Sequence, residues 1–84
     1  MDAGNLDLAG LVRTLVEPIV EYKDDLEIIE SEQGDDSFLI EIRVNEEDTG
    51  KVIGRQGRVI KSIRTISRAA AARANVHVDV ELLD

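Results

Sequence analysis

The chain has 84 residues, of which 43% are hydrophobic and 33% charged, a composition typical of one small soluble globular domain. It has no cysteine and a single histidine, His77, which excludes disulfide frameworks, zinc–thiolate sites and thiol nucleophiles. Because no apolar run approaches the ~18 residues of a membrane span and no basic cluster opens the chain, we expect no membrane insertion, no secretory signal and a cytoplasmic location.

The net charge of −8 argues by itself against a nucleic-acid partner, but the charges are unevenly distributed. Residues 1–49 hold 15 acidic and three basic residues, and residues 79–84 hold three acidic residues and no basic one. The segment between them has no acid and carries the bases Lys51, Arg55, Arg58, Lys61, Arg64, Arg68 and Arg73. A purely basic block inside an acidic chain indicates a surface for an anionic partner.

The first predicted element is an amphipathic helix over residues 8–19, where apolar residues recur every three or four positions. Asn5 or Asp7 can cap its N-terminus, and Pro18 is expected to kink or end it. The acidic opposite face disfavours a membrane anchor, so we expect this helix to cover a core.

An antiparallel hairpin is predicted next. Residues 26–30 and 38–44 alternate with a period of two, and Gly34-Asp35-Asp36 between them favours a turn. The second strand is expected to face the core with Phe38, Ile40, Ile42 and Val44.

Two helices and a strand are predicted after the hairpin. Asn45 can cap a short helix that Gly54 and Gly57 interrupt, and Asn75 can end a longer one that starts at Arg58. On the longer helix the apolar side comprises Val59, Ile60, Ile63, Ile66, Ala70 and Ala74, and the basic stripe beside it comprises Lys61, Arg64 and Arg68. Residues 76–82 alternate again as a last strand.

The element order helix–strand–strand–helix–helix–strand predicts an α+β fold with a three-stranded mixed sheet and three helices packed on one face. The hairpin pairs two strands antiparallel. The crossover through two helices should make its two strands parallel.

The segment Val52-Ile53-Gly54-Arg55-Gln56-Gly57-Arg58-Val59-Ile60 is the most informative part of the chain. Its two glycines frame a two-residue turn between helices, where missing side chains permit tight backbone angles and the close approach of another backbone. The next helix begins with N–H groups and a positive dipole end, and the flanking bases add charge, which suits a sugar–phosphate backbone. The alternative is a helix–helix turn in which the glycines serve geometry only.

This segment resembles the signature of the KH domain, which binds single-stranded RNA or DNA, and the element order is similar to the type II KH arrangement of bacterial proteins. Residues 47–58, followed by Ile63-Arg64-Thr65 and by residues 69–73, closely resemble the KhpA family of small bacterial single-KH RNA-binding proteins. The resemblance spans nearly the whole chain, so we expect a KH domain over residues 8–84 and an N-terminal extension, residues 1–7, without an assigned role.

The resemblance also implies a mode of binding. The loop that grips the backbone of about four nucleotides would comprise Gly54, Arg55, Gln56 and Gly57. The bases would lie over an apolar groove closed by residues 76–82. Some apolar residues would form the groove wall and others the core, and the sequence leaves open which do which: Val52, Ile53, Val59, Ile60 and Ile63. Phosphate attraction would come from Lys51, Arg58, Lys61 and Arg64. For Arg68 and Arg73 we favour a solvated helix face, and for His77 an outward strand position.

The sequence therefore predicts a single-stranded RNA-binding protein, an RNA chaperone or post-transcriptional regulator. Its affinity should be modest, because aromatic residues are only 2% of the chain and base stacking is correspondingly scarce. The alternative is a protein-interaction subunit. The resemblance implies a homodimer, pairing with a larger KH-containing protein (KhpB, also called EloR or Jag), and links to cell-envelope synthesis and cell division. Without a Walker motif or a nucleophile–base pair, we expect no enzymatic activity, no cofactor and no metal.

Overall fold

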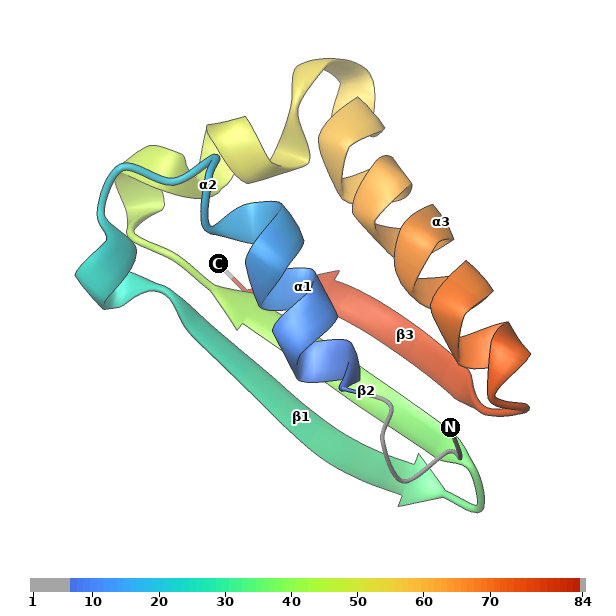
Figure 1. The fold of residues 1–84 in the computed structure, drawn as a ribbon. Helices are drawn as coiled ribbons and strands as arrows, with labels where there is room; N and C mark the ends of the chain where they lie inside the picture. Colours follow the sequence, from blue (N-terminus) through green and yellow to red (C-terminus); the bar gives the residue numbers. More distant parts are fainter. Residues whose placement is uncertain (1–6, 84) are drawn as a thin grey trace.

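The structure is a computed structural model that describes residues 7–83, and it has two layers (Figure 1). The strands are β1 (Glu27–Gly34), β2 (Ser37–Arg43) and β3 (His77–Leu82). The helices are α1 (Leu8–Val16), α2 (Glu46–Ile53) and α3 (Arg58–Arg73), with the short 3-10 turns η2 (Lys23–Asp25) and η3 (Arg55–Gly57). None of the helices in the described part is long and apolar enough to cross a membrane.

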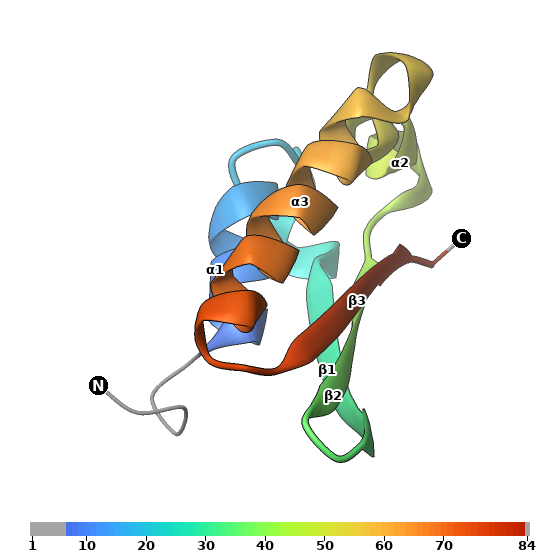
Figure 2. The same cartoon turned by 90° about the vertical axis from the view of Figure 1, so that its right-hand side faces the viewer.

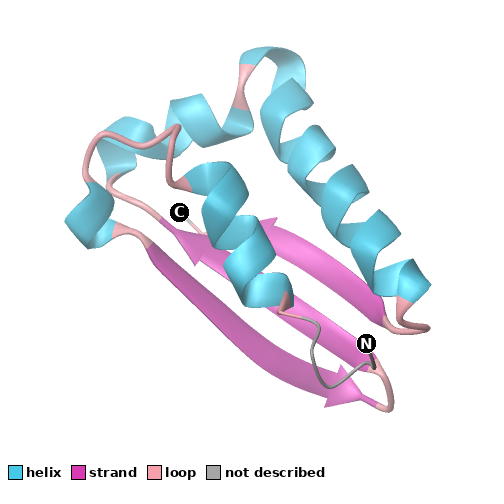
Figure 3. Ribbon diagram, in the orientation of Figure 1, coloured by secondary structure: helices cyan, strands magenta, loops and turns pink. Residues whose placement is uncertain are grey.

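The sheet is mixed, in the order β1-β2-β3. β1 pairs antiparallel with β2, from Glu27 opposite Arg43 onwards, and β2 pairs parallel with β3, from Ser37 opposite His77 onwards. Helices α1 and α3 cross one face of this sheet, while α2 continues from the end of β2 towards α3 (Figures 2 and 3). The predicted α+β fold, with its three-stranded mixed sheet and three helices, is confirmed.

Helix α1 has the N-terminal cap that its sequence predicts. The side chain of Asp7 accepts a hydrogen bond from the N–H of Gly10 at 2.9 Å, which satisfies one of the free amides of the first turn. The helix ends at Val16, two residues before Pro18, and the chain then turns. Asn5, the other candidate cap, lies outside the described residues.

The core lies between the sheet and the two helices that cross it. Ile40 and Ile42 on β2 are fully buried, and Phe38 and Val44 at the two ends of this row are partly buried, as the period of two predicts. Opposite them the buried residues of α1 are Leu8, Val12 and Val16. This burial supplies most of the driving force for folding in so short a chain.

The buried face of α3 differs from the predicted one. Ile66 is 45% exposed, whereas Ser67 and Ala71 are buried in line with Ile60 and Ile63. Ser67 can occupy the core because its hydroxyl donates to the carbonyl oxygen of Ile63 at 2.7 Å, so that no polar atom is left unpaired. The predicted apolar side of this helix is therefore wrong at Ile66, and it left out Ser67, because the pattern counted apolar residues only and a serine gives no signal of burial.

Helix α3 ends at Arg73, and Asn75, the predicted stop, follows two residues later with a φ of +59°. The N–H of Asn75 donates to the carbonyl oxygen of Ala72, and the N–H of Val76 donates to that of Ala71. These two hydrogen bonds close the last turn of the helix just before β3 begins.

Candidate nucleic-acid interface

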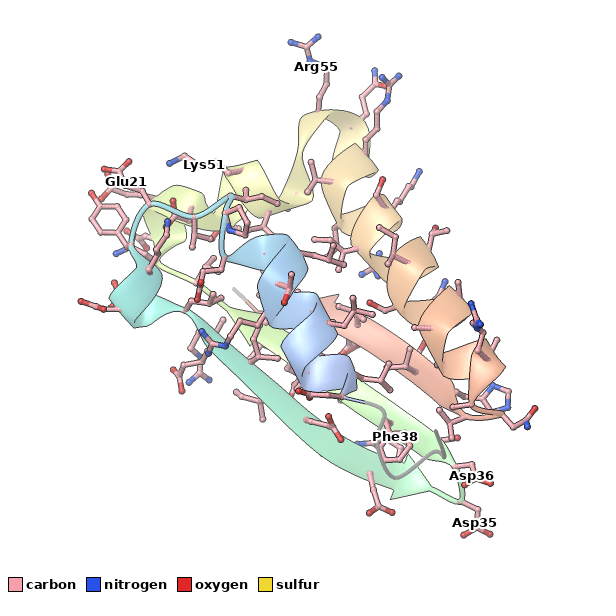
Figure 4. The ribbon with its side chains drawn as sticks, in the orientation of Figure 1. Glu21, Asp35, Asp36, Phe38, Lys51 and Arg55 are labelled. Atoms are coloured by element: carbon pink, nitrogen blue, oxygen red, sulfur yellow. The ribbon has the colours of Figure 1, made fainter. Side chains whose placement is uncertain are left out.

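The segment from Gly54 to Gly57 joins α2 to α3 and forms one end of the molecule (Figure 1). Three of its four residues have positive φ angles: Gly54 at +75°, Gln56 at +57° and Gly57 at +74°. The side chain of Arg55 points away from the rest of the protein (Figure 4). The segment is thus a tight, protruding bend, as the two glycines predict; we call residues 54–57 the glycine loop.

The two glycines of this loop are required for different reasons. A Cβ at Gly54 would lie 2.9 Å from the backbone nitrogen of Val59 and closer still to its side chain, so no other residue fits there. A Cβ at Gly57 would have no neighbour within 4 Å, so only its positive φ favours glycine. Gly54 therefore maintains the bend, while Gly57 leaves a bare stretch of backbone open to a ligand.

Several amides of the glycine loop are engaged within the protein. The N–H of Gly54 donates to Gly50 at 2.9 Å, and the N–H of Gly57 donates to Gly54 at 3.1 Å. The N–H of Arg58 donates to the carbonyl oxygen of Arg55. A phosphate at the loop would therefore have to be met by the amides of Arg55 and Gln56.

Four basic side chains extend from the loop along α3: Arg55, Arg58, Lys61 and Arg64. Within residues 7–83 none of the four forms an ion pair with a carboxylate. The guanidinium of Arg58 donates to the side-chain oxygen of Gln56 at 3.2 Å, which orients it beside the loop. The charges of Arg55, Arg58 and Lys61 are available to an external anion, and their charge-assisted hydrogen bonds suit phosphate oxygens.

Lys51 is directed elsewhere. Its ammonium lies 3.1 Å from Asp48 and 3.5 Å from Glu21, on the side of α2 that faces the segment after α1 (Figure 4). The hydrogen bond with Asp48 raises the pKa of Lys51 above its usual value. The structure thus places Lys51 in a pair with protein carboxylates and leaves the approach to the loop to the arginines.

Asp48 is a buried carboxylate in the first turn of α2, and no sequence pattern signals its burial. Its exposure is 0%, and it accepts hydrogen bonds at 3.0 Å from the backbone N–H groups of both Glu21 and Tyr22. Burial raises the pKa of Asp48, but the bonds from Tyr22, Glu21 and Lys51 outweigh it, and the pKa is lowered overall. Asp48 thereby ties the segment after α1 to the helix that carries the glycine loop.

The apolar residues around the loop divide between core and surface. Val52, Ile60 and Ile63 are buried in the core, and Val59 is half-buried against Gly54. Ile53 is 39% exposed, and of these five residues it offers the most apolar surface next to the loop. Val52 is fully buried and therefore belongs to the core beneath the loop rather than to a surface that a ligand could contact.

An open groove lies between α3 and β3, and we call it the α3–β3 groove. Its lower part is lined by Arg68 and Ala72 from the helix and by His77, Val78 and Asp79 from the strand. Arg68 pairs with Asp79 across it at 3.4 Å.

The basic stripe of α3 borders this groove. Arg64 reaches across to β3, where its Nε donates to the carbonyl oxygen of Val80 at 2.9 Å. Arg73 follows Arg64 by nine residues, two and a half helical turns, and so lies on the opposite flank. The sequence grouped Arg68 with Arg73 as solvated, and the structure separates them.

Comparison with known proteins assigns the family. The family model described as "KhpA/KhpB, KH domain" matches residues 9–82. The chain is 41% identical over 73 residues to the RNA-binding protein KhpA of Clostridium acetobutylicum, and these aligned residues cover 87% of this chain and 96% of that protein. It is 39% identical over 77 residues to the RNA-binding protein KhpA of Bacillus subtilis, and this alignment covers 92% of this chain and 94% of that protein. With its α-β-β-α-α-β order and the glycine loop between α2 and α3, the chain belongs to the KhpA/KhpB family of KH-domain proteins.

Proposed function

We propose that this protein binds single-stranded RNA by gripping the sugar–phosphate backbone with the glycine loop. The observation that carries this proposal is the bare backbone at Gly57, flanked by the guanidinium groups of Arg55 and Arg58, which have no carboxylate partner in the described structure. The relatives that are named RNA-binding proteins support the same role. In the cell the protein would act in the cytoplasm as an RNA chaperone or post-transcriptional regulator.

The strand would follow the α3–β3 groove from the glycine loop. Phosphates would meet Arg58 and Lys61 first, because these side chains lie on the first turn of α3. The exposed side chain of Ile53 would provide an apolar contact beside the loop. Beside the groove, Asp79 and Glu81 line a depression together with Arg64 and Arg68, and their carboxylates repel phosphates, so that side would be occupied by bases.

The affinity of one domain should be modest. The aromatic residues are Tyr22, which follows Glu21 in the chain, and Phe38. Phe38 lies far from Arg55 (Figure 4). Stacking contributes about 1–3 kcal/mol per base where an aromatic platform exists, and the glycine loop has none among its residues. Binding should therefore depend mainly on phosphate contacts and fall steeply with salt.

A charge placed at Gly57 tests the grip. Asn and Asp both tolerate a positive φ, and open space surrounds this position, so Gly57→Asn and Gly57→Asp should both fold. Only Gly57→Asp adds a negative charge, and we expect it to abolish binding of a short uridine-rich oligonucleotide, while Gly57→Asn retains part of it. Fluorescence anisotropy measures the binding and circular dichroism the fold. A folded Gly57→Asp protein that binds like the wild type would refute the proposal.

Assembly is a second candidate function, favoured by the exposed Ile66. This side chain is 45% exposed on α3, and Ala69 on the same helix is also exposed. Such a face could join two copies of the chain or pair it with a larger KH-containing protein in pathways of cell-envelope synthesis and cell division. Sedimentation equilibrium at tens of micromolar tests self-association: a dimer that Ile66→Glu dissociates supports this function, and a monomeric wild type removes the homodimer from the account.

A further inference from the structure

One hydrogen bond in the α3–β3 groove has a consequence for base recognition. The Nε of Arg64 donates to the carbonyl oxygen of Val80 at 2.9 Å, and Arg64 is half-buried. β3 is an edge strand of the sheet, paired on one side with β2. Arg64 therefore contacts the free edge of the sheet, at the point where a base in the groove would meet it.

The pairing of β3 shows which backbone groups face that edge. The N–H of His77 donates to Asp36 at 2.7 Å, and the N–H of Leu83 donates to Ile42 at 2.8 Å. Since successive residues of a strand direct their backbone groups to opposite sides, the odd-numbered residues face β2. The N–H and C=O of Val80 both point to the free edge, as the bond from Arg64 to its carbonyl independently indicates.

Arg64 changes what this edge offers to a base. An uncovered strand edge presents an acceptor and a donor side by side, which matches the N6 amino group and N1 of adenine. The Val80 carbonyl already accepts from Nε, and beside it the position presents three donor groups, the Val80 N–H and the two terminal amino groups of Arg64. Among the described residues those amino groups have no hydrogen-bond partner.

We propose that Arg64 makes this point of the groove selective for guanine over adenine. Guanine offers two adjacent acceptors, O6 and N7, that an arginine can bind together, whereas adenine has an amino group in place of O6 that needs an acceptor. This inference rests on the proposed binding of single-stranded RNA and names its base preference.

The surrounding charges direct Arg64 to a base rather than to a phosphate. Asp79 and Glu81 line the same depression as Arg64, so the local field disfavours a second anion there. Arg68, the other arginine of this depression, lies 3.4 Å from Asp79. Among the described residues, Arg64 is thus the arginine of this site whose two terminal amino groups are both free, whereas Nη2 of Arg68 donates to Asp79.

Purine analogues test the preference directly. The probes are uridine heptamers with one central purine: guanine, adenine, inosine (which keeps O6 and N7 but lacks the 2-amino group) or 7-deazaguanine (which lacks N7). For the wild type we expect guanine and inosine to bind alike, both at least about fivefold more tightly than adenine, because a bidentate pair is worth ~1–3 kcal/mol. The 7-deazaguanine heptamer should bind more weakly than the guanine one.

Arg64→Lys should remove the preference and keep the charge. We expect the guanine-to-adenine ratio to fall close to one, while the dependence of binding on salt stays that of the wild type. Arg73→Lys is the matched control, since it makes the same change on the opposite flank of the same helix, and its ratio should equal that of the wild type.

The outcomes separate this inference from the proposed function. An equal loss for guanine and adenine in Arg64→Lys would show that Arg64 is a phosphate contact, and a wild type that does not distinguish the purines would also overturn the inference. In both cases RNA binding that is lost in Gly57→Asp would still uphold the proposed function. A wild type that binds none of the heptamers at low salt would overturn both. Should Arg64→Lys fail to fold, the analogue series on the wild type decides alone.

Discussion

At the residue scale, single groups hold the glycine loop in place through contacts that are distant in sequence. Asp48 accepts bonds from the amides of Glu21 and Tyr22, 27 and 26 residues before it, and pairs with Lys51. Gly54 packs against Val59, at the start of α3. The loop is therefore fixed on both of its flanks, and two predictions follow from these groups.

The first prediction concerns acid. Because the pKa of Asp48 is lowered in the folded state, its ionised form stabilises the fold above the unfolded pKa of about 3.9, and this contribution is lost as the pH falls through the lower folded value. The free energy of unfolding of the wild type should thus drop more between pH 6 and pH 3 than that of Asp48→Asn, which cannot titrate. Urea titrations at each pH measure both. Glu46→Gln, an exposed change in the same helical turn, is the control and should follow the wild type.

The second prediction compares the two glycines. Gly57→Ala should lower the free energy of unfolding by about 1–2 kcal/mol, because a residue with a Cβ is strained at a positive φ. Gly54→Ala should cost clearly more, because its Cβ would also collide with Val59. Urea denaturation gives both values, and equal costs would contradict the different roles assigned to the two positions.

At the scale of elements, α3 has one buried row of residues with a different flank on each side of it. Ile60, Ile63, Ser67 and Ala71 face the core. One flank borders the α3–β3 groove with the basic stripe, and the exposed Ile66 lies away from it. The same helix thus contributes to the core, to the proposed RNA path and to a proposed assembly face without any residue having to serve two of them.

This division of α3 predicts a large difference between two isoleucines. Ile63→Ala should destabilise the protein by ~2–5 kcal/mol, as expected for a buried side chain that leaves a cavity. Ile66→Ala should change the stability by about 0.5 kcal/mol or less in the monomer, because the side chain is largely exposed. Thermal or urea unfolding at low protein concentration checks this, and a cost of several kcal/mol for Ile66→Ala would place that residue in the core after all.

At the scale of the whole molecule, the glycine loop and the acidic hairpin turn lie at opposite ends. Arg55 lies at one end and the hairpin turn with Asp35 and Asp36 at the other (Figure 4), in a molecule whose longest extent is 37 Å. This length is several times the screening distance of about 8 Å at physiological ionic strength. The acidic hairpin should therefore not weaken RNA held at the loop, while the net charge of −8 limits capture of nucleic acid on the rest of the surface.

Salt titrations test this separation. The slope of log K against log salt is about −0.7 for each phosphate contacted in a single strand. Arg55→Gln should make the slope less negative by about 0.7, since it removes one such contact. The double change Asp35→Asn and Asp36→Asn alters the net charge by two at the far end and should leave the slope unchanged. A shift of the slope in the hairpin variant would show that RNA also passes over that end.

The amino-acid sequence alone predicted the elements, their order and the glycine loop, because period-two and helical patterns, caps and paired glycines act over a few neighbouring residues. It also separated the basic block that carries Arg55 and Arg58 from the acidic remainder. It did not show the burial of Asp48, because the backbone amides that donate hydrogen bonds to this carboxylate lie more than 20 residues earlier in the chain. It also placed Ile66 on the apolar side of α3 and left out Ser67. An apolar pattern cannot reveal that the hydroxyl of Ser67 donates a hydrogen bond to the carbonyl oxygen of Ile63, which allows the serine to be buried. The bond from Arg64 to Val80, and with it the donor character of the groove, was decided only when tertiary packing placed α3 against the edge of β3.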